Sequence, residues 1–99
     1  MNFNIEQNED NVICTLSGRL NTEVATELCA QVDELIAQSQ GKQLAIDCYG
    51  LEYISSSGLR LFLKIRKQIS GTILIKGMKP DIKQILTLTK IDEFFEFED

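Results

Sequence analysis

The chain has 99 residues, enough for one domain with a single hydrophobic core and too few for two. Apolar residues make up 43% and charged residues 25%, as in ordinary globular proteins. The net charge of −5 argues against nucleic acid as a direct partner, because binding to phosphates requires a basic surface. No apolar run approaches the roughly 18 residues of a membrane span. Residues 1–10 lack the basic-then-apolar order of a signal peptide, so we expect a cytoplasmic location.

Two residue types restrict the possible chemistry. The chain contains no histidine, which removes the commonest general base and the commonest metal ligand. We therefore expect a protein that is not an enzyme and that needs neither a metal nor another cofactor. The three cysteines, Cys14, Cys29 and Cys48, are an odd number without CxxC spacing. Each lies in an apolar periodic segment, which predicts small core residues.

The first half of the chain predicts two strands followed by a helix. Alternating apolar residues predict strands over 3–6 and 12–16, joined by a polar hairpin loop at 8–11. Residues 17–20 then lead out of the second strand, and Asn21 is a good N-cap. The helix is expected over residues 22–37, ending before Gly41. Its apolar stripe consists of Val24, Leu28, Val32, Leu35 and Ile36.

The middle of the chain predicts a strand over 43–47 that is apolar on both faces, as in a strand covered on both sides or in the interior of a sheet. A polar turn over 47–53 follows, in which Asp47 is expected to accept hydrogen bonds from the loop backbone. Leu51 and Ile54 return to the core. A helix is expected over 57–69. Its predicted inner residues are Leu59, Phe62, Leu63 and Ile69, with Leu61 and Ile65 at the margins and a basic outer stripe of Arg60, Lys64 and Lys67.

The last third predicts a strand over 72–76, a turn at Gly77 and a helix that begins at Pro80. The inner face of this helix is expected to contain Ile82, Ile85, Leu86 and Thr89. The tail over 92–99 is predicted to be a short strand or packed segment anchored by Phe94, Phe95 and Phe97. Strands that alternate with single helices require parallel connections. The expected fold is therefore one α/β domain over residues 1–99, with a mixed sheet of four to five strands and helices largely on one face.

The stretch Ser55-Ser56-Ser57-Gly58 stands between the central strand and its helix. A serine at a helix start accepts a hydrogen bond from an unpaired backbone N–H group, which explains one of the three serines. Three in a row are more than a cap needs. The start of a helix is also where an added negative charge is best tolerated.

Charge is unevenly distributed along the chain. Residues 1–50 hold eight acids and two bases, whereas residues 60–90 hold eight bases and the single acid Asp81. The basic residues lie on segments with helical and strand periodicity, so they do not form a disordered block. They are either solvated helix faces or a partner surface of mixed sign.

Two motifs carry a family resemblance. Residues 47–59, DCYGLEYISSSGL, are similar to an aspartate-led turn followed by an apolar residue, Asp-Ser-Ser-Gly-Leu and a helix. Residues 18–21, GRLN, are similar to Gly-Glu-Leu-Asp ahead of the first helix. With both motifs in order, the chain resembles over its whole length the anti-sigma factor antagonist branch of the STAS domain family (sulfate transporter and anti-sigma factor antagonist).

The resemblance implies a partner-switching mechanism. The unmodified protein would bind an anti-sigma factor that is also a serine kinase, thereby freeing a sigma factor. Phosphorylation of the second serine of the motif would break that complex, and a metal-dependent serine phosphatase would restore it. Aligned on Gly58, that serine is Ser57, with Ser56 as the runner-up. The expected partner-binding residues are Asn21, Ser55, Ser56, Ser57, Gly58, Arg60 and Lys64, and we expect a monomer when the protein is unbound.

Two positions depart from the family pattern, because Ser55 and Asn21 stand where the family has aspartate. Both can still cap a helix, but the carboxylate beside the phosphoacceptor is absent. This favours an alternative, a STAS module that is not phosphorylated and serves as a scaffold or ligand-binding subunit, for example in a lipid-transport complex. A third hypothesis is an enzyme with Ser57 as nucleophile and Lys64 as base, about two helical turns away.

Overall fold

The computed structural model describes residues 1–98, so Asp99 of the predicted tail lies outside the described residues. The elements in chain order are β1 (Asn2–Gln7), β2 (Asn11–Leu20), α1 (Thr22–Glu27), α2 (Cys29–Ser39), β3 (Gln43–Ile54), α3 (Ser56–Gln68), β4 (Ile73–Lys76), α4 (Pro80–Leu88), the 3₁₀ turn η1 (Ile91–Phe94) and β5 (Glu96–Glu98).

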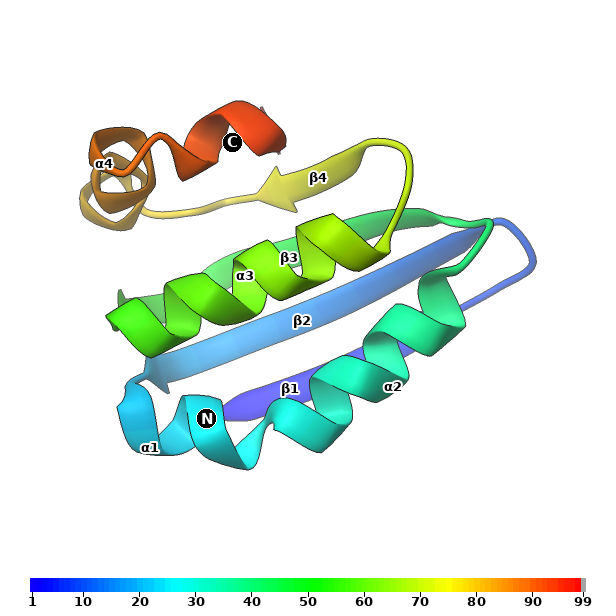
Figure 1. The fold of residues 1–99 in the computed structure, drawn as a ribbon, viewed down its shortest axis with the longest axis horizontal. Helices are drawn as coiled ribbons and strands as arrows, with labels where there is room; N and C mark the ends of the chain where they lie inside the picture. Colours follow the sequence, from blue (N-terminus) through cyan, green and yellow to red (C-terminus); the bar gives the residue numbers. More distant parts are fainter. Residues whose placement is uncertain (99) are drawn as a thin grey trace.

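A five-stranded sheet with the order β1-β2-β3-β4-β5 forms the frame of the molecule. β1 and β2 are antiparallel, and each later neighbour pairs in parallel. Helices α1, α2 and α3 lie on the same side of the sheet, and α4 with η1 lies beside β4 (Figure 1). The predicted α/β class, the mixed sheet and the placement of the helices are therefore confirmed.

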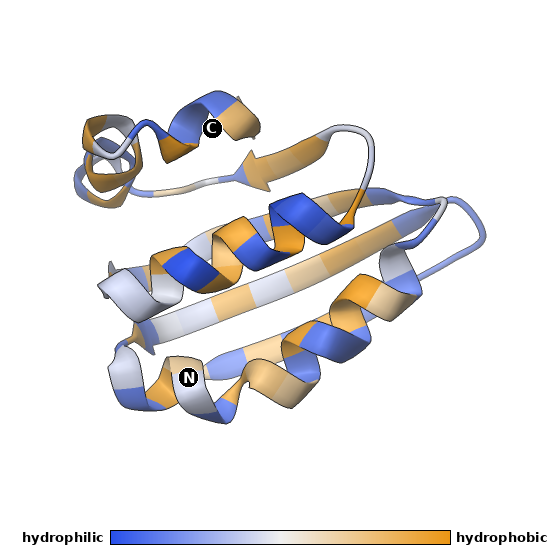
Figure 2. Cartoon of the chain, viewed as in Figure 1, coloured by the Kyte–Doolittle hydropathy of each residue, from blue (hydrophilic) through white to orange (hydrophobic). Residues whose placement is uncertain are grey.

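The core fills the space between the sheet and these helices. Alternate residues of the central strands are buried there, which is the period-two pattern of a sheet packed on one face. Hydrophobic and hydrophilic residues alternate along α3 (Figure 2), as in a helix with one buried face. On this helix, the ring of Phe62 packs edge-on against the ring of Phe95, with centroids 6.1 Å apart. The fully buried side chains include Val12, Leu35, Leu44, Ile46, Leu51, Ile73, Ile75 and Leu86.

The polar turn predicted over 47–53 is wrong, because this segment continues β3 to Ile54. β2 likewise runs on to Leu20 rather than ending near residue 16. Register shifts near Ser17 let the two strands stay paired. The close approach of the two strands here requires glycine at position 50, because a Cβ there would lie only 2.7 Å from the Cβ of Ser17. The predicted hydrogen bond of Asp47 is present, from the Tyr49 N–H at 3.1 Å, but it lies within a strand.

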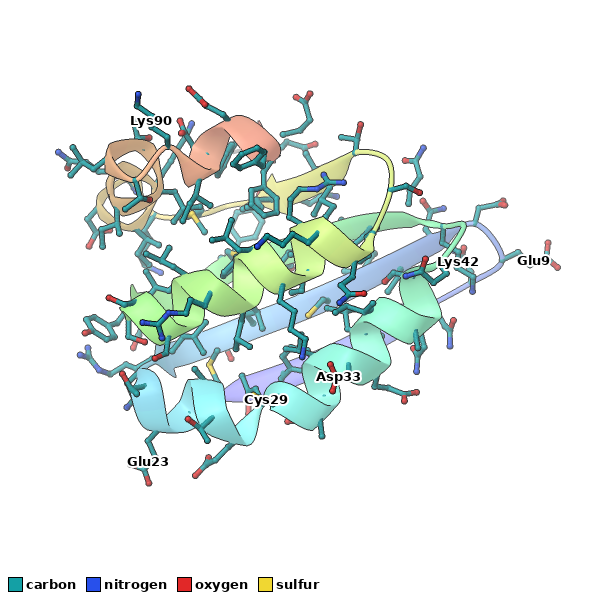
Figure 3. The ribbon with its side chains drawn as sticks, in the orientation of Figure 1. Glu9, Glu23, Cys29, Asp33, Lys42 and Lys90 are labelled. Atoms are coloured by element: carbon teal, nitrogen blue, oxygen red, sulfur yellow. The ribbon has the colours of Figure 1, made fainter. Side chains whose placement is uncertain are left out.

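The first predicted helix is divided at Leu28 into α1 and α2. Leu28 is buried, and its ψ of −5° departs from the helical value, so the chain bends between α1 and α2. The bend leaves Cys29 exposed at the start of α2 (Figure 3), which contradicts its predicted burial. Cys14 and Cys48 are buried as predicted.

The predicted burial of several side chains is also wrong in α3, in α4 and in the tail. On α3 the predicted margins Leu61 and Ile65 are buried, while Leu59 and Leu63 are only half-buried, so the buried face of the helix is centred on Phe62 and Ile65. On α4, Ile82 and Leu86 are buried, whereas Ile85 and Thr89 are exposed. In the tail, Phe95 is buried and Phe97 half-buried, but Phe94 is 55% exposed.

The apolar run of β3 was predicted to mean a strand that is either covered on both faces or interior to the sheet, and the second interpretation is confirmed, because β3 is the central strand of five. Ala45 alternates with the buried Leu44 and Ile46 and remains half-buried on the side away from the helices. Within residues 1–98, no helix has the length and apolar character needed to cross a membrane.

Candidate functional site

Two helix N-termini meet at one edge of the sheet. The last residues of β2 and β3, Leu20 and Ile54, are paired neighbours, and the Ser55 N–H donates to the carbonyl oxygen of Leu20 at 2.9 Å. Asn21 and Ser55 therefore start α1 and α3 side by side, at the carboxyl ends of the parallel strands (Figure 1). This arrangement brings together the two sequence motifs, which are 26 residues or more apart in the chain.

Each helix is capped by the side chain that precedes it. Asn21 Oδ1 accepts a hydrogen bond from the Val24 N–H at 2.9 Å, which confirms the predicted N-cap. Ser55 Oγ accepts one from the Gly58 N–H at 3.2 Å. Of the three consecutive serines, Ser55 is thus the cap, and the hydroxyls of Ser56 and Ser57 belong to the first turn of α3.

Gly58 holds this turn against the core. It is buried, and a Cβ added there would lie 2.8 Å from both Ile54 Cγ1 and Leu20 Cγ. Only glycine therefore lets α3 start this close to the ends of β2 and β3.

Ser57 lies next to a positive charge. It is half-buried, and its Oγ accepts a hydrogen bond from Arg60 Nη1 at 3.3 Å, whereas Ser56 is exposed. The first turn of α3 contains no acid, so its helix dipole is not offset there by a carboxylate. A negative group on Ser57 would meet the dipole and a guanidinium able to form charge-assisted hydrogen bonds.

A neighbouring aromatic contact was not predicted from the sequence. The guanidinium of Arg19 lies 4.4 Å from the centroid of the Tyr53 ring. The two residues are partners in the extended β2–β3 pairing, and 40% of Tyr53 is exposed. Residues 17–20 were expected to lie beyond the second strand and residues 47–53 in a turn, so the sequence did not indicate this cation–π pair.

Lys64 has a different environment from Arg60. Its Nζ lies 2.6 Å from Asp33 Oδ1, which ties α3 to α2, and the hydrogen bond to Asp33 raises the pKa of the lysine. Asp33 projects from α2 in Figure 3. The structure thus places Lys64 beside Asp33, while the hydroxyl of Ser57 contacts Arg60.

Thiols and carboxylates elsewhere form no obvious reactive centre. Burial raises the pKa of Cys14 and of Cys48 to about 12, with smaller contributions to Cys48 from Cys14 and Asp47. Such thiols stay protonated at neutral pH and are poor nucleophiles. In the part of the chain that the structure describes, no three Cys, Asp or Glu residues are grouped as metal ligands.

Comparison with known proteins agrees with the motifs and the fold. The family model described as the STAS domain matches residues 2–99. The chain therefore belongs to the STAS domain family. Its mixed five-stranded sheet with helices on one face is the fold of the anti-sigma factor antagonists in this family.

Several relatives are similar over nearly the whole chain. BtrV of Bordetella bronchiseptica, provisionally named an anti-sigma factor antagonist, is 27% identical over 96 residues, which cover 90% of this chain and 78% of BtrV. The structure of a STAS domain protein from Planctomyces limnophilus matches with a TM-score of 0.87 at 18% identity, covering 98% of this chain and 88% of that one. Bacillus SpoIIAA in its phosphorylated form matches with a TM-score of 0.72 at 16% identity, covering 99% and 92%.

Proposed function

We propose that this protein is an anti-sigma factor antagonist that acts by partner switching, with Ser57 as the regulated position. In its unmodified form it would bind an anti-sigma factor that is also a serine kinase, and so release a sigma factor. Phosphorylation of Ser57 would end that binding, and a metal-dependent serine phosphatase would reverse the modification. The protein itself would need no cofactor and catalyse no reaction.

The observation that carries this proposal is the division of roles among the three serines. Ser55 uses its hydroxyl to cap α3, so the hydroxyl of Ser57 is not needed to start the helix. Ser57 Oγ is instead paired with Arg60 Nη1 on the helix surface. A phosphate on Ser57 would add about −1.5 to −2 charges without removing the cap.

The physical effect of that phosphate is expected at the surface and not in the fold. The dipole of α3 and the guanidinium of Arg60 favour the added charge, so the domain should stay folded. A partner packed over this edge of the sheet would meet a bulky dianion. The cost of desolvating an unpaired charge is several kcal/mol, enough to weaken a complex by orders of magnitude. SpoIIAA, whose solved structures include an unphosphorylated and a phosphorylated form, supports this view, since both match this chain with TM-scores of 0.73 and 0.72.

The same site supports a second candidate, a STAS scaffold or ligand-binding subunit that is not phosphorylated. The observation in its favour is Ser55, which caps α3 where the family has aspartate and leaves the first turn without an acid. A kinase that recognises that carboxylate would not recognise this chain. A gene for an anti-sigma serine kinase next to the gene for this protein favours partner switching, whereas neighbouring genes for a membrane transporter favour the scaffold.

The two candidates predict different behaviour of Ser57 variants. Ser57→Asp should weaken binding to the serine kinase that copurifies with the unmodified protein by tenfold or more, about 1.4 kcal/mol or above, while Ser57→Ala should still bind. Isothermal titration calorimetry measures both affinities. Ser56→Asp is the matched control, because it adds the same charge one position earlier on an exposed side chain.

Equal affinities of Ser57→Asp and Ser57→Ala would contradict the switch. A loss with Ser56→Asp and not with Ser57→Asp would keep the mechanism and move the modified position. Circular dichroism and thermal unfolding of each variant would show whether a loss of binding follows from a loss of structure.

A further inference from the structure

The face of the sheet that carries no helix is more apolar than an exposed face requires. The central strands β2, β3 and β4 each contain three successive apolar residues, and the middle one of each points away from the helices. These middle residues are Ile13, Ala45 and Leu74, of which Ile13 is 40% exposed and the other two half-buried. Continuous apolar runs of this kind are typical of strands covered on both faces.

The three residues form one row across the sheet. Ile13 pairs with Ala45, and Ala45 with Leu74, on adjacent parallel strands. The row spans β2 to β4, about 10 Å at the usual strand spacing, which is close to the width of an α-helix with its side chains. A shallow hollow of about 520 Å³ lies over it, and its lining includes these three residues together with Gln43, Thr72, Lys76 and Glu96.

The row is bordered by acids. Glu6 is the partner of Ile13 on β1, and Glu96 the partner of Leu74 on β5, so a carboxylate ends the row on each side. The next row toward the carboxyl ends of the parallel strands adds acids at Asp47 and Glu98 and one base at Lys76. With four acids and one base, these two rows have a net charge of −3 around a narrow apolar centre.

We propose that this face, which we call the open sheet face, is a docking surface for a basic amphipathic helix of a partner protein. The apolar side of one helix would cover Ile13, Ala45 and Leu74. Lysines or arginines on its flanks would pair with Glu6 and Glu96, which lie one strand beyond the apolar row on either side. The surface lies on the opposite side of the sheet from α3, which carries Ser57, so the docking does not depend on the proposed switch.

A second copy of this chain is a poorer occupant. Two open sheet faces packed against each other would each bring a net charge of −3 into the interface, and acids directly opposite acids are destabilising. The small apolar row also implies modest, reversible binding rather than a permanent dimer.

The test uses the whole protein and a synthetic helical peptide of about 18 residues, or five turns, with leucines on one side and lysines on its flanks. A control peptide has the same composition with the leucines scattered, so it has the same charge but no apolar face. Amide chemical shifts of ¹⁵N-labelled protein report where each peptide binds. We expect the amphipathic peptide to shift the amides of residues 13, 45 and 74, and the control to bind at least about tenfold more weakly.

Variants then separate the apolar and the charged contributions. Ile13→Lys should weaken binding of the amphipathic peptide about tenfold or more. The matched control Leu88→Lys changes a 75% exposed leucine of α4 and should leave the affinity unchanged. Glu96→Lys changes only the border of the row and should also weaken binding, with a loss that shrinks in high salt.

Absence of binding at millimolar peptide, equal binding of the two peptides, or shifts located at α3 or α4 would each overturn the proposal. So would concentration-dependent dimerisation of the free protein that Ile13→Lys abolishes, because the occupant would then be a second copy. None of these results bears on Ser57, whose variants are tested against the kinase.

Discussion

At the residue scale, Gly58 is the position on which the geometry of the candidate site depends most. Gly58→Ala would place a methyl group 2.8 Å from Ile54 Cγ1 and Leu20 Cγ. We expect a loss of about 1–3 kcal/mol in the free energy of unfolding, as for other overpacked cores. Urea unfolding followed by circular dichroism measures it. Ser56→Ala, an exposed neighbour, is the control and should change stability by less than about 0.5 kcal/mol. An unchanged midpoint in Gly58→Ala would show that the first turn of α3 is not held tightly.

The three cysteines should differ sharply in reactivity. Cys29 is exposed, whereas Cys14 and Cys48 are buried with a pKa of about 12. At pH 8, a thiol reagent such as Ellman's reagent should therefore modify one thiol per native chain, and all three after denaturation. Cys29→Ser should remove the native reaction. Rapid reaction of two or three thiols in the folded protein would contradict the buried positions.

The same two thiols give a pH dependence of stability. Their pKa is raised from 9.0 to about 12, so between these values the folded chain holds protons that the unfolded chain has lost. Stability from this source is therefore fully present below pH 9 and falls as the pH rises toward 12. A double variant, Cys14→Ala with Cys48→Ala, should lose stability less steeply over this range, as measured by thermal unfolding at a series of pH values.

At the scale of elements, α4 is attached to the central strand through Lys79. Lys79 Nζ donates hydrogen bonds to the carbonyl oxygens of Tyr49 and Leu51, at 3.0 and 3.1 Å. Lys79→Met should cost about 1.5–3 kcal/mol, the range for hydrogen bonds to charged groups, and should speed amide hydrogen exchange in α4 first. Lys67→Met, at an exposed lysine of α3, is the matched control. Exchange that is no faster in α4 would mean that packing alone holds this helix.

The elements themselves could be predicted where the signal is local. Periodicity located α3, α4 and β4 to within a few residues, and Pro80 marked the start of α4. The extension of β3 could not be predicted, because it depends on the approach of Gly50 to Ser17 from another strand. The break between α1 and α2 at Leu28 could not be predicted either, because the apolar residues of the two helices form one continuous stripe in the sequence.

For the candidate site, the sequence predicted the Asn21 cap and one capping serine, because these are contacts within a few residues, and the structure shows that the capping serine is Ser55. Contacts between elements, such as Arg19 with Tyr53 or Lys64 with Asp33, could not be predicted, because their residues are far apart in the chain. Lys64 is paired with Asp33, and Arg60 is the basic residue whose hydrogen bond to Ser57 the structure shows.

At the scale of the whole molecule, the sheet separates two surfaces with different chemistry. One edge presents the starts of α1 and α3, with Ser57 beside Arg60. The open sheet face presents an apolar row bordered by Glu6 and Glu96. Under the two proposals, one partner would bind the open sheet face while phosphorylation of Ser57 controls the other surface, because the phosphate would lie on the opposite side of the sheet.

The switch at Ser57 is the central claim, and mass spectrometry of the protein from its own cells tests it most directly. The peptide spanning Cys48 to Arg60 would be compared in growing and stressed cultures, with a Ser57→Ala strain to assign the site. We predict a phosphate on Ser57 whose occupancy changes with the condition. No phosphate on this peptide in any condition would contradict partner switching and favour the constitutive scaffold, with Ser55 in place of aspartate as the physical reason.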